Sequence, residues 1–292
     1  MVDYNSKEWF RTIFSLHKGD TVRKLGPTLL GMLVYCTAVA YFIIEYVHPG
    51  PDSDLKNIAI MHSLLGFVIS TLLVFRTNTA YDRWWEGRKA WGSLTNNSRN
   101  LAIKLAHILN AEDEEDRLFF RAMIPNYAYA LKNHLRGHFR PDEWEACPGF
   151  DPASALPDRH QPNQMAMRLF GKLDELYQRG VIRPEHLLVL NAEFQSFTEI
   201  CGICERIHTT PIPYSYSSFL KKFIALYCLT LPIGYVLSLH YWVIPVVLIV
   251  FYVLASLELI AEEIEDPFGT DANDLPTDRM AASIRVAITE LV

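Results

Sequence analysis

The sequence predicts an all-α integral membrane protein with four transmembrane helices and a helical cytoplasmic domain. Four apolar segments form two pairs, one on each side of a long polar middle. Lysine and arginine gather at the same end of both pairs, which is typical of cytoplasmic ends. The middle shows helical spacing of apolar residues and no strand-like alternation of useful length.

The composition excludes several classes of protein. Of the 292 residues, 50% are hydrophobic and 12% are aromatic, so a disordered chain is not expected. The net charge of -6 argues against a nucleic-acid partner. The five cysteines are scattered and odd in number, which fits a reducing compartment better than a disulfide framework.

The N-terminal segment, residues 1–24, is predicted to be a cytoplasmic helix that lies on the membrane surface. Its apolar side chains, such as Trp9 and Phe14, are interspersed with charges along the whole segment. An apolar stretch followed by a small-residue cleavage site is absent, so the segment is not interpreted as a secretory signal.

The first transmembrane hairpin is predicted over residues 25–75. Leu25 to Val47 has Glu45 as its only charge, and Ile58 to Phe75 has no charge over 18 residues. A transmembrane helix needs roughly 17–25 mostly apolar residues. Both segments are therefore interpreted as spans.

The second transmembrane hairpin is predicted over residues 219–262. Its spans run from about Phe223 to Leu239 and from about Trp242 to Leu257, joined near His240. Buried helices of a soluble protein seldom pair in this way around a polar middle. The two short spans are therefore predicted to cross the bilayer as well.

The positive side chains orient the spans. They are Arg23 and Lys24 before the first span, Arg76, Arg83, Arg88 and Lys89 after the second, and Lys221 and Lys222 before the third. The links between paired spans have almost none. Both termini and the middle are therefore expected in the cytoplasm.

The middle, residues 76–218, is predicted to be a cytoplasmic helical domain. No proline interrupts the chain from Phe67 to Trp91, which predicts one long helix that leaves the bilayer and continues into this domain. The expected helices are about 78–110, 114–135, 164–179 and 184–208. Residues 263–292 form a cytoplasmic C-terminal segment, and the sequence makes no prediction for the partner of residues 275–292.

The second span has an unusual stripe. Phe67, Thr71 and Phe75 recur every four residues and share one face of a helix, with Ser63 one turn earlier. Small and hydroxyl side chains in a span are typical of close helix packing. A pore lining, with phenylalanine as a constriction that excludes water, fits the same pattern.

Two further clusters resemble metal ligands. Cys201, Cys204 and His208 share a helix face, but a structural zinc site wants four ligands, so we interpret the cysteines as small buried thiols. An acidic run follows the fourth span, and it is interpreted either as solvated carboxylates or as a site for a hard cation. Its members are Glu258, Glu262, Glu263, Glu265, Asp266, Asp271 and Asp274.

Enzyme motifs are absent from the sequence. It contains no glycine-rich phosphate loop, no H-E-x-x-H and no G-x-S-x-G. An enzyme is therefore not predicted.

Three motifs in order resemble the bestrophin family, its bacterial branch in particular. They are Arg83-Trp84-Trp85 directly after a span, Pro211-Ile212-Pro213 before the third span, and Asp266-Pro267-Phe268-Gly269 after the fourth. The resemblance runs from about Leu25 to Asp274. It implies a homopentameric ion channel with a central pore in the bacterial inner membrane, whose partners are four further copies, the lipid bilayer and permeant monovalent ions.

The resemblance also implies roles for individual residues. Phe67, Thr71 and Phe75 match the three positions of a narrow neck, where the family usually has bulky apolar residues. Thr71 departs from this pattern, so a wider or wetter neck is expected. Glu185 matches a second constriction at the cytoplasmic exit, which is usually apolar.

Alternatives to this placement of Glu185 remain open. A register shift would put Ile182 or His186 at the aperture instead. Glu185 would also be favoured simply as a carboxylate in the first turn of a helix.

Calcium is the one cofactor that the resemblance raises. Asp271 and Asp274 match two side-chain positions of the calcium clasp of animal members, but the surrounding acidic run is reduced here. We expect a weak calcium site or none, and no other cofactor.

The predicted function is passive passage of monovalent ions. Five copies of Glu185 would attract cations and repel anions, which favours sodium or potassium over chloride. An anion channel like the animal members is the alternative. A membrane-anchored scaffold is a third hypothesis, whereas a secondary transporter would usually show inverted repeats.

Overall fold

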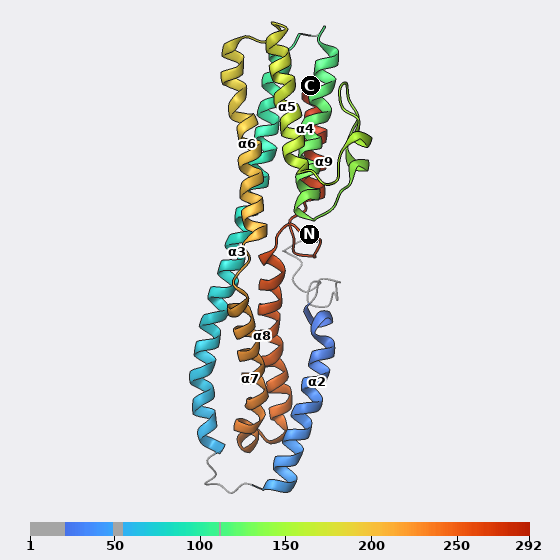
Figure 1. The fold of residues 1–292 in the computed structure, drawn as a ribbon. Coiled ribbons are helices and arrows are strands. Elements are labelled where there is room, and N and C mark those ends of the chain that lie inside the picture. Colours follow the sequence, from blue (N-terminus) through green and yellow to red (C-terminus); the bar gives the residue numbers. More distant parts are fainter. Residues whose placement is uncertain (1–20, 49–54, 111) are drawn as a thin grey trace. The chain divides into compact units, whose positions relative to one another are not determined.

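The computed structural model describes residues 21–48, 55–110 and 112–292, and this part of the chain forms helices without a β-strand (Figure 1). The predicted surface helix of residues 1–24 lies largely outside the described residues. The α-helices are α2 (Thr21–Phe42), α3 (Leu55–Ile108), α4 (Glu114–Leu135), α5 (Gln161–Gln178), α6 (Pro184–Thr209), α7 (Tyr214–Leu239), α8 (Val243–Glu265) and α9 (Thr277–Leu291). Short helical turns are η1 (Ile43–Val47), η2 (Pro141–Glu143), η3 (Pro152–Ser154) and η4 (His240–Trp242).

The helices form two compact units. The first contains the described residues up to Arg83 together with residues 211–265 and 271–273. The second contains residues 84–210, 266–270 and 274–292. Both units include part of α3, which confirms the prediction of one uninterrupted helix.

The first unit is built from α2, α7, α8 and the N-terminal part of α3. The helices α2, α7 and α8 pack against one another. At η4 the chain reverses within three residues, and His240 has a positive φ of 49° at this reversal. The helices α7 and α8 therefore form a hairpin.

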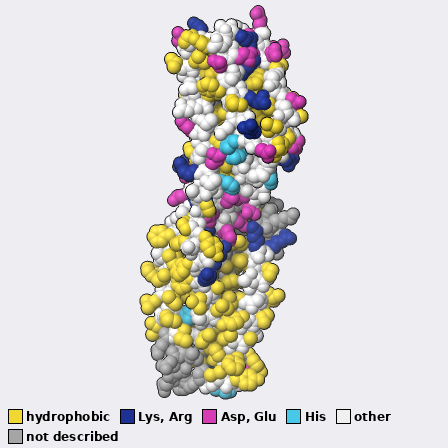
Figure 2. All heavy atoms as spheres, in the orientation of Figure 1, with side chains coloured by type: hydrophobic (Ala, Val, Ile, Leu, Met, Phe, Trp, Pro, Cys, Tyr) yellow, Lys and Arg dark blue, Asp and Glu magenta, His cyan; other side chains and the backbone are white. Residues whose placement is uncertain are grey.

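Apolar side chains predominate on the face of the first unit that Figure 2 shows. Among the described residues, three helical segments are long and apolar enough to cross a membrane: Thr21–Val47, Ile58–Ile108 and Tyr214–Glu265. The third contains the α7–α8 hairpin, so it holds two helices of 26 and 23 residues.

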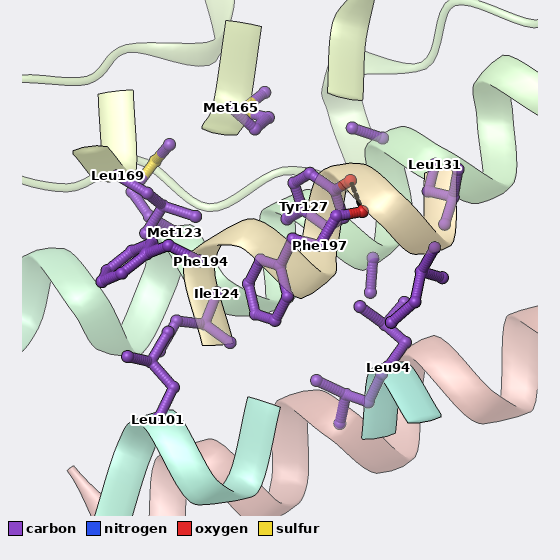
Figure 3. Close-up of a cluster of buried hydrophobic side chains, with 14 of the residues drawn as sticks. Leu94, Leu101, Met123, Ile124, Tyr127, Leu131, Met165, Leu169, Phe194 and Phe197 are labelled. Carbon is purple, nitrogen blue, oxygen red and sulfur yellow. Dashed lines mark hydrogen bonds between the residues drawn. The ribbon is translucent and has the colours of Figure 1, made fainter. Parts of the chain in front are cut away.

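The second unit has a conventional buried core (Figure 3). Trp91, Leu94 and Leu101 of α3 are fully buried there, in the same cluster as Tyr127 of α4 and Phe197 of α6. The Tyr127 hydroxyl donates a hydrogen bond to the Phe197 carbonyl at 2.5 Å, and the two rings stack. Each Å² of apolar surface that is removed from water contributes about 25 cal/mol to the free energy of folding, so such a core is the main source of stability.

The predicted helices of the second unit are confirmed with small differences at their ends. The helix α4 has the predicted bounds. The helix α5 begins three residues early, because the His160 ring accepts a hydrogen bond from the Asn163 backbone N–H and caps its first turn. The C-terminal helix α9 packs on α4 through Ala281, Ile284 and Ile288, so this segment docks on its own chain.

Candidate functional site

The three predicted neck residues lie on one exposed face of α3. Phe67 and Phe75 are 75% and 63% exposed, and Thr71 between them is exposed as well. The Thr71 hydroxyl donates a hydrogen bond to the Phe67 carbonyl at 2.9 Å, one turn earlier in the helix. The structure thus places the three side chains in one continuous stripe.

The sequence analysis missed the polar continuation of this stripe. Asn78 and Asp82 follow Phe75 at spacings of three and seven residues, and both are exposed. The helical repeat of 3.6 residues puts them on the face of Phe75. The stripe therefore becomes polar after Phe75, with one carboxylate at Asp82, a change that the same spacing rule would have found.

The opposite face of α3 is buried in the first unit. Ile69 and Leu73 are almost fully covered, and the buried ring of His62 forms a hydrogen bond with the Thr230 hydroxyl of α7 at 2.9 Å. A Cβ atom on Gly66 would lie 2.9 Å from the Tyr227 hydroxyl oxygen. Gly66 therefore allows α3 and α7 to approach closely, and this contact fixes which face of α3 stays exposed.

A buried arginine follows the stripe directly. Arg76 is 1% exposed, and its guanidinium forms ion pairs with Glu265 at 2.7 Å and with Glu258 at 3.4 Å. The Glu265 carboxylate also accepts a hydrogen bond from the Ile212 backbone N–H at 2.6 Å. These contacts lock the rotation of α3 next to Phe75.

The glutamates of the acidic run at the end of the fourth predicted span form ion pairs with basic side chains. Glu262 pairs with Lys221 at 2.8 Å, and Glu263 pairs with Lys24. Together with the pairs of Arg76, these contacts account for all four glutamates from Glu258 to Glu265. Of the three aspartates in the run, Asp266 and Asp271 are exposed, so the run is only partly solvated, and a cation-binding role for it stays a prediction.

Glu185 lies exposed in the first turn of α6, directly after Pro184. Of the two alternatives, Ile182 is buried in the core of the second unit. The His186 ring accepts a hydrogen bond from the Arg183 backbone N–H at 3.4 Å and is half-buried. Exposure therefore favours Glu185 over both, while its role at an aperture stays a prediction.

The two predicted calcium ligands differ in their surroundings. Asp271 is exposed, whereas Asp274 is buried. A Cβ atom on Gly269 would lie 2.7 Å from an Asp274 carboxylate oxygen. A side chain at position 269 would therefore clash with this carboxylate, and glycine avoids the clash. A calcium-binding role stays a prediction.

The two cysteines of the α6 motif lie in the core of the second unit. Cys201 and Cys204 are buried free thiols, as expected. Burial, assisted by the nearby Glu205, raises the pKa of Cys201 to about 12, so it remains protonated at neutral pH. The His208 ring instead contacts the Asp266 carboxylate at 3.5 Å.

Comparisons with known proteins identify the family to which this chain belongs. The sequence profile of the family described as "Bacterial/Fungal Bestrophin protein" matches residues 1–290. The chain belongs to this bestrophin family. Together with its long apolar helices, this makes the chain a membrane protein.

Relatives and solved structures agree with this assignment. A Nostoc protein is 35% identical to this bestrophin over 98% of this chain and 92% of its own. YneE of Escherichia coli K12 is 30% identical over 100% and 94% of the two chains, and both relatives are named voltage-dependent anion channel-forming proteins. A bestrophin homolog from Klebsiella pneumoniae superposes with a TM-score of 0.79 at 27% identity, covering 92% of this chain and 98% of that one.

Proposed function

We propose that this bestrophin is a homopentameric channel that passes monovalent ions passively through the bacterial inner membrane. The observation behind the proposal is the exposed stripe of α3, which lies opposite a face that the first unit buries. A ring of symmetric copies would turn such stripes toward a common axis. Membership of the bestrophin family and the channel names of the relatives support the proposal.

Four helices cross the bilayer in the proposed topology. They are α2, the N-terminal part of α3, α7 and α8, in hairpins over residues 25–75 and 219–262. The helical domain of residues 76–218 and both termini face the cytoplasm. The reversal at η4 supports two spans within the apolar segment Tyr214–Glu265.

The neck works by excluding water. Rings of Phe67 and Phe75 would form two hydrophobic constrictions, which an ion enters only after losing part of its hydration. A ring of Thr71 between them supplies hydroxyl oxygens and shortens the dry path. The proposed neck is therefore wetter than one built from three apolar rings.

Selectivity for cations follows from the acidic groups along the path. Glu185 contributes five carboxylates at the cytoplasmic aperture, and Asp82 contributes five beyond the neck. Carboxylate rings raise the local concentration of cations and repel anions. Sodium and potassium are the proposed permeant ions.

An anion channel is the second candidate. It is favoured by the names of the relatives, which call them anion channel-forming proteins. In this alternative Glu185 does not face the permeation path.

The reversal potential of the purified protein in a planar bilayer under a sodium chloride gradient tests the proposal. We expect a value near the sodium equilibrium potential, and Glu185→Gln should move it toward zero. The matched control is Glu115→Gln, which also removes an exposed carboxylate from the first turn of a helix and should leave the potential unchanged. A wild-type value near the chloride potential would establish the anion channel, and no current from a verified pentamer would favour the scaffold.

A further inference from the structure

Three side chains from distant parts of the sequence converge within the second unit. His134 lies in the last turn of α4, His160 caps the start of α5, and Glu205 lies near the end of α6. Their ligand atoms all lie within 4.8 Å of one another. Among the described residues this is the one such group of three or more histidine, cysteine, aspartate or glutamate side chains.

The cluster is a hydrogen-bonded group whose ligand atoms lie close enough together to share one metal ion. The Nε2 atoms of His134 and His160 lie 2.7 Å and 2.6 Å from the same carboxylate oxygen of Glu205. Two imidazoles and a carboxylate are a ligand set that Zn²⁺ and similar divalent ions take in proteins. Side-chain exposures of 30–35% leave access for the ion and for a water as fourth ligand.

Neighbouring groups orient the His160 ring in the metal-free protein. Cys201 lies one turn before Glu205 on α6. The Nδ1 atom of His160 accepts a hydrogen bond from the Asn163 backbone N–H at 3.2 Å. Nε2 of the neutral ring therefore carries the proton that points at Glu205.

We propose that His134, His160 and Glu205 bind one divalent transition-metal ion per subunit, with Zn²⁺ as the representative. When the ion binds, each neutral ring transfers its Nε2 proton through solvent to its own Nδ1, so that the Nε2 lone pairs of both rings coordinate the ion and no net proton is released. Nδ1 of His160 then no longer accepts the hydrogen bond from Asn163. The bound ion joins the ends of α4, α5 and α6, and this role is independent of which ion the channel passes.

Calorimetric titration of the metal-free, detergent-solubilised full-length protein with zinc chloride tests the proposal. We expect one Zn²⁺ per subunit and at least a tenfold loss of affinity in Glu205→Gln and in His134→Gln. Glu205→Gln keeps a carbonyl oxygen that both rings can donate to, so the packing of the helices is retained. His208→Gln is the matched control, because His208 faces a single carboxylate without a second histidine.

Cobalt(II) spectroscopy identifies the ligands independently. We expect visible absorption bands without a thiolate-to-cobalt charge-transfer band, unchanged in Cys201→Ser. A thiolate band, wild-type affinity in both ligand variants, or no binding by the wild-type protein would each overturn the proposal. If one variant does not elute as the wild-type oligomer, the other decides.

Discussion

Arg76 places a buried positive charge inside the otherwise largely apolar first unit. Its guanidinium lies next to two glutamates of α8 and is shielded from solvent. Buried charges cost more in desolvation than they gain unless each has a partner. The arrangement is therefore stable only when all three groups are present.

Replacing Arg76 should be among the most damaging single changes. Arg76→Gln leaves the buried Glu258 and the largely covered Glu265 without this cation, and the expected cost is about 3–5 kcal/mol of stability. Thermal unfolding of the detergent-solubilised protein measures it as a lower Tm. Arg140→Gln, which breaks an exposed pair with Asp142, should leave Tm nearly unchanged, and an equal drop in both variants would contradict this role of Arg76.

At the scale of the element, α3 is notable for a glycine in its middle. A Cβ atom on Gly87 would lie 3.1 Å from ring carbons of Phe268 and 3.2 Å from Pro267. The turn after α8 thus packs on the bare backbone of α3. This contact explains why a weak helix former is found inside such a long helix.

Gly87→Ala should destabilise the second unit although it improves helix propensity. The gain in propensity is about 1 kcal/mol, whereas overpacking costs about 1–3 kcal/mol. The matched control is Gly171→Ala in α5, where the added Cβ meets no atom within 4 Å, and this variant should be stabilised. Thermal unfolding of both variants checks the opposite signs, and a stabilised Gly87→Ala would refute the close packing.

An ion-pair cluster joins α4 to α5. The Asp116 carboxylate is buried and contacts Lys172 at 2.7 Å and Arg179 at 3.1 Å. Burial acts to raise the pKa of Asp116, but hydrogen bonds from Lys172 and Arg179 outweigh it and lower the pKa below its usual 3.8. The ionised carboxylate is therefore favoured by folding.

The contribution of this cluster to stability should depend on pH. Because the pKa of Asp116 is lowered by folding, its stabilisation is present above the unfolded pKa of 3.8 and is lost as the pH falls through the folded value. Asp116→Asn should cost about 2 kcal/mol at pH 7, and the difference from wild type should shrink as the pH falls from 3.8 through the lowered pKa of the folded state. Unfolding curves over a series of pH values from 7 downward test this, and a constant difference would contradict the assignment.

The elements of this protein were largely predictable, but their cross-links were not. Local sequence signals predicted the ends of α4 and α6 to within one residue. The absence of proline predicted that α3 is continuous. The partners of Arg76 follow it by more than 180 positions, and no local pattern connects them. The same holds for His134, His160 and Glu205, which only the packing of three helices brings together.

At the scale of the whole molecule, the stripe of α3 predicts assembly. Phe67 and Phe75 would be costly in water, and in the proposed channel they are covered by copies of themselves. Light scattering of the detergent complex should therefore give a protein mass about five times the 33.5 kDa of one chain. A monomeric or dimeric mass in several mild detergents would exclude the proposed pore.

The candidate site was predictable in part at this scale too. Spacing alone selected Phe67, Thr71 and Phe75, and the structure exposes all three on one face. Which side of the helix is buried depends on His62, Gly66 and their contacts on α7, which spacing does not reveal. The role of Glu185 depends on the arrangement of several subunits, and one sequence does not specify that arrangement.

The hydrogen bond from Thr71 to the Phe67 carbonyl has a consequence for charge discrimination in the proposed neck. The hydroxyl hydrogen is already committed to the helix backbone, so only oxygen lone pairs remain to point outward. In the proposed pentamer, a ring of five such oxygens would offer a passing cation electron pairs in place of lost water. An anion would instead need hydroxyl hydrogens as donors, and these already bind the backbone carbonyl of Phe67.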